Sequence, residues 1–142
     1  MTETASWSVG VRRAQLAMGL GFLAMALGAF LTSSLMGPLF HRMASSPVWA
    51  RMLVFELLLP QLWALVVLPL LAYGTARVVP LNPWPASLAA VLTGEGFIYA
   101  VRRVLQGDGP RPSVGVAAAE VGVIALGVWL TQAAIRRARR KV

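Results

Sequence analysis

Three of the five acidic residues in this chain, Glu56, Glu95 and Glu120, stand inside long apolar runs, where a carboxylate is costly. An unpaired charge at the centre of a bilayer costs on the order of 3 kcal/mol. We therefore expect these side chains to face the interior of a helix bundle, hydrogen-bonded or paired with an arginine. A helical rise of about 1.5 Å per residue brings all three to a similar depth, so they can meet at one internal point.

Glu95 is the predicted centre of this polar site. It shares a helical face with Tyr99 and Arg102, at spacings of four and seven residues, and Gly94 and Gly96 leave room for a helix, a water molecule or a ligand beside it. The full predicted intramembrane polar site contains Glu56, Glu95, Glu120, Gln61, Tyr99, Arg51, Arg102 and Arg103.

Such a set of polar residues has three possible roles. Polar side chains often hold helices together, within one chain or with a partner subunit, and this is the first interpretation. Passage of protons or cations is the second, because such pathways use acidic residues that face a bundle interior. An intramembrane enzyme is the third and most remote.

Enzyme motifs are sparse. His41 is the only histidine, the chain has no cysteine, and no H-E-x-x-H zinc motif is present. A hydrolase would have to combine His41 with one of the nearby serines, Ser33, Ser34, Ser45 or Ser46. We predict no catalytic residues, no metal site and no cofactor.

Composition places the chain in a membrane. Its 142 residues are 58% hydrophobic and 13% charged, with a mean hydropathy of +0.70. We expect one all-α domain over residues 1–142, a polytopic protein with four transmembrane helices in an antiparallel bundle. The predicted helices cover residues 14–36, 47–77, 85–105 and 113–136, followed by a basic tail, 136–142. Each contains an apolar window close to the roughly 20 residues that span a hydrocarbon core.

Proline and glycine divide these helices. Gly37-Pro38 is expected to end the first helix, which we interpret as an uncleaved span rather than a signal peptide. Pro60 and Pro69 should bend the second helix, with Gln61 placed to satisfy a freed carbonyl group. The first helix also carries a face of small residues that favours close helix packing: Ala17, Gly21, Ala24 and Gly28.

The net charge of +8 comes from arginines and one lysine that cluster at helix ends, which indicates topology and lipid contact rather than nucleic acid. With four spans, eight basic residues lie on the side of the termini and five on the other, so both termini should be cytoplasmic. The tail residues expected to meet anionic lipid headgroups are Arg136, Arg137, Arg139, Arg140 and Lys141.

Together these patterns predict a small protein of a bacterial inner membrane, acting as a non-catalytic subunit or oligomeric component of a membrane complex. The expected partners are membrane lipids and either further copies of the chain or a larger complex. A small proton- or cation-coupled transporter or channel using the intramembrane glutamates is the alternative.

Overall fold

The computed structural model describes the backbone of residues 2–140 and the side chains of residues 9–140. The regular structure of this part of the chain is helical, with no strand, which confirms the predicted all-α class. The first helix, α1 (Thr2–Arg42), is 41 residues long and contains Pro38.

The predicted bounds of the first helix, 14–36, are wrong at both ends. Before residue 14 the described chain has no proline and one glycine, so nothing stops the helix. Pro38 removes one backbone donor without ending α1, and the Leu39 carbonyl group still accepts a hydrogen bond of 2.9 Å from the Met43 N–H group. A proline in a long apolar helix can therefore be accommodated when the flanking turns remain intact.

The second helical region is divided into two arms. The first arm consists of α2 (Val48–Met52) and the π-helical turn η1 (Leu53–Leu58), and the second of the π-helical turn η2 (Trp63–Val67) and α3 (Leu68–Ala76). The helix direction changes by 60° between the two arms, so the predicted helix over 47–77 is broken rather than gently kinked. Pro69 lies where η2 passes into α3, and the helix continues through it without a break.

The last two helices form an antiparallel hairpin, α4 (Pro83–Gln106) and α5 (Val114–Arg140). Gly107, with a positive φ of 62°, follows α4 and lets the chain turn. The residues predicted as a basic tail continue α5 as helix up to Arg140. Lys141 and Val142 lie outside the described residues.

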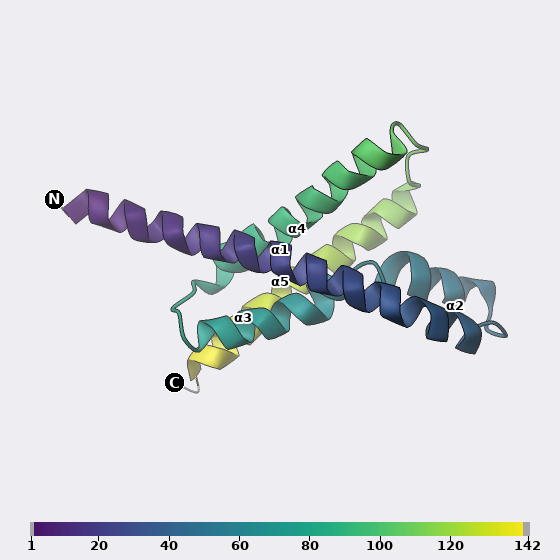
Figure 1. Ribbon diagram of the computed structural model, residues 1–142, viewed down its shortest axis with the longest axis horizontal. Coiled ribbons are helices and arrows are strands. Elements are labelled where there is room, and N and C mark those ends of the chain that lie inside the picture. Colours follow the sequence, from purple (N-terminus) through teal and green to yellow (C-terminus); the bar gives the residue numbers. More distant parts are fainter. Residues whose placement is uncertain (1, 141–142) are drawn as a thin grey trace.

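Figure 1 shows the helices crossing near the middle of α1. Both chain ends lie on the same side of this crossing, and the α1–α2 and α4–α5 connections lie on the other side, where the two hairpins diverge. An antiparallel four-helix bundle is therefore not confirmed. The helices are packed together toward the termini and separate toward the two connections.

Alanine dominates the core. Two clusters of buried apolar side chains hold α1, η2, α3, α4 and α5 together, and small residues let these helices approach closely. The first cluster contains Ala17, Ala72, Ala76, Leu81, Ala86, Ile135 and Ala138, and the second contains Ala24, Trp63, Ala64, Val67, Leu68, Ala90 and Val91.

The small face of α1 lies at its contacts with α4 and η2. Ala17 and Ala24 are buried, and a Cβ atom added to Gly21 would lie 2.8 Å from the carbonyl carbon of Ala90, closer than real Cβ atoms come. Glycine at this position thus allows α1 and α4 to meet through their backbones.

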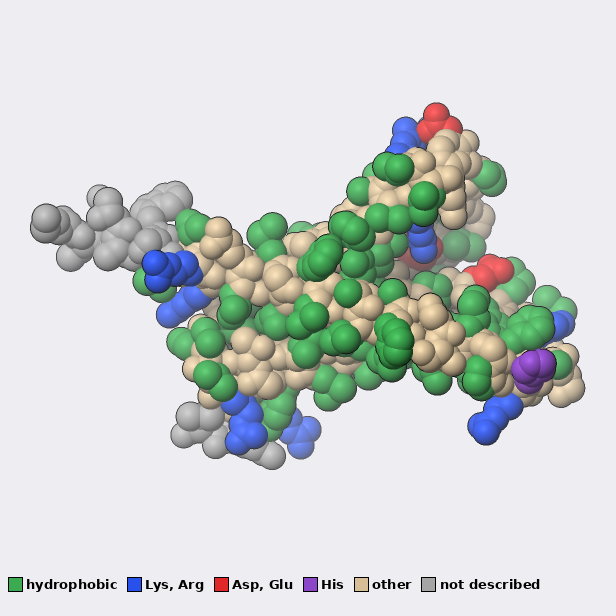
Figure 2. Space-filling model, viewed as in Figure 1, with side chains coloured by type: hydrophobic (Ala, Val, Ile, Leu, Met, Phe, Trp, Pro, Cys, Tyr) green, Lys and Arg blue, Asp and Glu red, His purple; other side chains and the backbone are tan. Residues whose placement is uncertain are grey.

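Two helices in the described residues are long and apolar enough to cross a membrane, Val9–Arg42 and Val114–Arg140. The bent pair Val48–Leu58 and Trp63–Ala76 adds a third if its arms form one span. Large apolar side chains such as Phe22, Phe30 and Trp129 are exposed, and Figure 2 shows apolar side chains over the middle of the molecule with basic groups toward its ends. This surface is compatible with a membrane protein.

Candidate functional site

The break in the second helical region positions the candidate site. Pro60 lacks an N–H group and so cannot donate the hydrogen bond that would continue the helix from η1 into η2. The carbonyl group of Leu59, at the break, accepts a hydrogen bond of 2.9 Å from the Thr32 hydroxyl group on α1. A neighbouring helix thus satisfies backbone at the bend, as proline inside a membrane helix requires.

Trp63, the first residue after the bend, is inserted between two glycines. A Cβ atom added to Gly28 of α1 would lie 2.7 Å from the Trp63 Cα atom, and one added to Gly94 of α4 would lie 2.9 Å from Trp63 Cζ2. Glycine at position 28 leaves space for the backbone and Cβ atom of Trp63, glycine at position 94 leaves space for its indole ring, and the residue is 2% exposed. Trp63 is therefore the point at which α1, η2 and α4 meet.

A polar pair lies beside this tryptophan. The Gln61 side chain is 6% exposed and lies beside the carboxyl group of Glu95, which is half-buried on α4. Within the described residues, one oxygen of each side chain, Oε1, is buried and has no hydrogen-bond partner. Two buried acceptors without a protein donor are unusual in a folded protein, and they leave this pair able to accept a hydrogen bond from another group.

Two further charged residues act on Glu95. Arg102 attracts a negative charge at this carboxyl group, and Glu120 of α5 repels it. Arg102 is exposed, whereas Glu120 is half-buried. Four residues of the predicted polar site, Glu95, Gln61, Glu120 and Arg102, are thus brought together from the bend, α4 and α5.

The other four predicted residues are placed differently. Glu56 is exposed on η1 and is not among the groups that act on Glu95, and Tyr99 is 67% exposed. Arg103 forms an ion pair with Asp108, 3.0 Å between Nη2 and Oδ1, on the surface of the α4–α5 connection. Arg51 is half-buried, and its Nε atom has no partner in the part of the chain that the structure describes.

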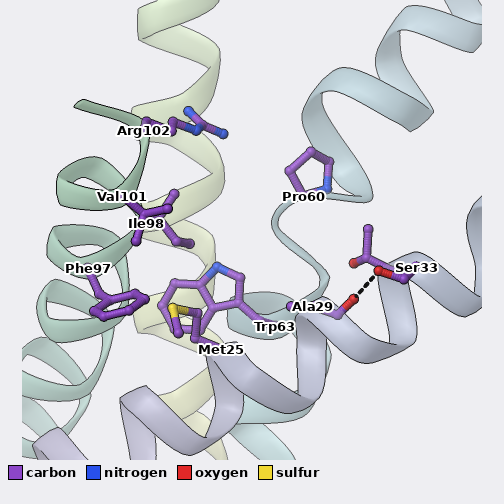
Figure 3. Close-up of a pocket in the computed structure, with 10 residues that line it drawn as sticks. Met25, Ala29, Ser33, Pro60, Trp63, Phe97, Ile98, Val101 and Arg102 are labelled. Carbon is purple, nitrogen blue, oxygen red and sulfur yellow. Dashed lines mark hydrogen bonds between the residues drawn. The ribbon is translucent and has the colours of Figure 1, made fainter. Parts of the chain in front are cut away.

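An open groove of about 390 Å³ lies between α1, the bend and α4. Figure 3 shows Trp63 at its base, with Phe97, Ile98 and Val101 of α4 on one side and Pro60 and Ser33 on the other. The groove is lined by Met25, Ala29, Thr32, Ser33, Pro60, Trp63, Phe97, Ile98, Val101 and Arg102. It is mostly apolar, with one arginine.

The Trp63 indole N–H group is the only buried donor in this groove, and no described residue accepts its hydrogen. Figure 3 shows the indole nitrogen on the ring edge that faces Arg102 rather than Met25. The site therefore offers apolar walls together with an unsatisfied donor, Trp63 Nε1, and two unsatisfied acceptors nearby. This arrangement can bind a helix or a small molecule, or hold a proton or a water molecule.

Groups suited to hydrolysis or metal binding are not assembled. Ser33 and Ser34 donate their hydroxyl hydrogens to backbone carbonyl groups one turn earlier, at Ala29 and Phe30, both at 2.9 Å. His41 is exposed in the last turn of α1. Among the described residues no cluster of three histidine, cysteine, aspartate or glutamate side chains could hold a metal ion.

Sequence reasoning missed two residues of this site. Trp63 carried no functional prediction, although a large aromatic residue three positions after a proline, with glycines on other helices, can fill a helix crossing. Thr32 was also missed. Its hydroxyl group inside the apolar run of α1 is the signal that could have found it, since such groups often bond a neighbouring helix.

Comparison with protein-family models, with curated proteins and with solved structures finds no match to this chain. The function must therefore be argued from the groove and its polar groups.

Proposed function

We propose that this chain is a small polytopic protein of a bacterial inner membrane and a non-catalytic component of a membrane assembly. Its four spans are α1, the bent region from α2 to α3, α4 and α5. Both termini are cytoplasmic, since the basic residues are more numerous on that side.

The fourth span in this proposal is α4. Its 24 residues extend about 36 Å, more than the roughly 30 Å of a hydrocarbon core. Thr93, Gly94, Glu95 and Gly96 lower its hydropathy, and Gly94 packs against Trp63, just after the bend. We interpret α4 as a span whose polar centre is kept for an internal contact.

The observation that carries the proposed function is the groove between α1 and α4. Helices in lipid associate through close packing, so an open apolar groove beside buried unsatisfied polar groups is an incomplete helix interface. A transmembrane helix of a second copy or of another subunit, carrying a carbonyl or hydroxyl acceptor for Trp63, would complete it.

A photo-crosslinking amino acid placed at Ala29, which lines the groove, tests this proposal in native membranes. The matched control is Leu31, two residues along α1 and exposed outside the groove. We expect a defined protein adduct from position 29, with a second copy or a membrane subunit that mass spectrometry identifies, and little from position 31. Equal adducts from both positions, or none from position 29, would contradict a partner in the groove.

Proton or cation coupling is the second candidate function, and the unsatisfied oxygens of Glu95 and Gln61 favour it. A proton on Glu95 would supply the donor that both acceptors lack. In reconstituted vesicles, Glu95→Gln should abolish proton or cation flux and keep the fold, whereas the exposed Glu56→Gln should keep both. Absence of flux from the unsubstituted protein would exclude this candidate.

A further inference from the structure

Two adjoining hollows lie along α4 and α5, separate from the groove between α1 and α4. The first is an apolar groove of about 340 Å³ between α4 and α5, with walls that include Leu88, Val91, Ile124 and Val128. The second is a pocket of about 400 Å³ near the end of α5, lined by Trp129, Gln132, Ala133, Arg136, Arg137 and Arg140. Trp129 and Gln132 line both, so the two hollows adjoin at these residues.

The pocket near the end of α5 has the chemistry of an anion site. Three guanidinium groups, from Arg136, Arg137 and Arg140, line it, and no acidic side chain does so in the described part of the chain. Arginine donors match phosphate oxygens in geometry and charge. These arginines are exposed and form no ion pair with any described residue, so they are free to bind a ligand.

Gln132 supplies a second, independent indication of a ligand. It is 7% exposed, and its amide nitrogen has no hydrogen-bond acceptor among the described residues. A buried amide N–H group without an acceptor is uncommon and calls for a partner that the protein does not provide. Gln132 lines the pocket, so a ligand bound there lies next to the side chain that carries this donor.

The apolar groove shows that the ligand is amphipathic. Its walls are almost wholly hydrocarbon and indole, and it leads along the two helices to the basic pocket. A free phosphate ion would use the arginines and leave the groove empty. A hydrocarbon chain in this groove would cover apolar surface that both helices expose.

We propose that the combined hollow binds one anionic phospholipid, with its phosphate on Arg136, Arg137, Arg140 and Gln132 and an acyl chain between α4 and α5. The lipid belongs to the leaflet in which α5 ends, and Trp84 and Trp129 lie where its chain enters the groove. This site does not depend on a partner in the groove between α1 and α4.

Native mass spectrometry of the purified protein in neutral detergent tests the headgroup. The probes are phosphatidylglycerol and phosphatidylcholine with the same acyl chains, added at equal concentration. We expect selective binding of one phosphatidylglycerol. Arg136→Gln with Arg140→Gln should weaken it about 25-fold, at about fivefold for each arginine.

The matched control is Arg139→Gln, because Arg139 is on the same helix and exposed but does not line the pocket. It should change binding less than twofold in a neutral micelle, where no charged surface attracts every arginine alike. Equal loss from Arg139→Gln, or equal binding of phosphatidylcholine, would overturn the proposal. Full displacement by millimolar inorganic phosphate would do the same, since it would indicate a simple anion site.

The acyl-chain groove is tested with Ala125→Leu, which fills it, and Ala119→Leu, an exposed position on α5 outside it. Ala125→Leu should weaken phosphatidylglycerol binding about 15-fold by displacing about two methylene groups, while Ala119→Leu should not. Thermal melting of each variant shows whether it is folded. A folded Ala125→Leu protein with unchanged affinity would overturn the groove as the acyl-chain site.

Discussion

Replacing Gly94 with alanine should destabilise the protein, because the new Cβ atom would collide with the Trp63 ring. The nearest ring atoms are Cη2, Cζ3 and Cζ2, the last at 2.9 Å, and Gly28 confines the same residue from the other side. Overpacking of this kind typically costs about 1–3 kcal/mol. Trp63 is buried, so a shift of its ring away from the new Cβ atom would disturb its other packing contacts.

Gly96 provides the matched control two residues along α4. An added Cβ atom there meets nothing within 4 Å, so Gly96→Ala should gain roughly 1 kcal/mol from helix propensity alone. Gly94→Ala makes the same gain and then loses the cost of overpacking. The free energies of unfolding of the two variants should therefore differ by about 1–3 kcal/mol.

Thermal melting in detergent, followed by intrinsic tryptophan fluorescence, measures this difference. For a chain of this size 1 kcal/mol corresponds to about 3–4 °C, so the Tm of Gly94→Ala should lie about 3–12 °C below that of Gly96→Ala. Trp63→Phe removes the ring atoms that collide and should relieve most of the added cost, giving a coupling free energy of at least about 1 kcal/mol. Equal Tm values for the two alanine variants, or strict additivity with Trp63→Phe, would refute the placement of Trp63 against Gly94.

Three other predictions address packing, the bend and topology. Gly21→Leu and Gly28→Leu should each lower the Tm by several degrees, while Gly19→Leu, on an open face of α1, should not. Equal Tm changes in all three variants would place the small face in lipid. Thr32→Val should cost about 1 kcal/mol by removing the hydrogen bond to the Leu59 carbonyl group, with the exposed Ser34→Ala as control, and no difference between them would show that the bend needs no support from α1. Cysteines introduced at Ser45 and Asp108 of this cysteine-free chain should react with an impermeant thiol reagent from outside the cell, and labelling only after membrane disruption would reverse the proposed orientation.

The helical class and much of the polar cluster could be predicted from the sequence. Hydropathy marks the apolar segments, and a carboxyl group such as Glu95 inside one of them must find a polar neighbour, as it does in Gln61. Depth along a helix is computable from rise alone. These inferences need only local sequence and the cost of burying charge.

The geometry of the bend could not be predicted in this way. Pro38 and Pro60 remove the same backbone donor, yet α1 continues through one and the second helical region breaks at the other. The difference depends on tertiary neighbours. At the break beside Pro60, Thr32 supports the Leu59 carbonyl group, and Trp63 inserts between two glycines of other helices. The rotation of each helix about its axis likewise left Glu56 exposed, although its depth resembles that of Glu95.

The partner-binding role of the groove between α1 and α4 is tested most directly by the mass of the assembly released from native membranes. Native mass spectrometry would compare the unsubstituted chain with Ala29→Trp, which fills the groove, and Leu31→Trp, which adds the same side chain outside it. We predict that the unsubstituted chain and Leu31→Trp each carry a second copy or another subunit, and that Ala29→Trp is released as a single folded chain. A single chain in all three samples, or a partner retained by Ala29→Trp, would contradict this role.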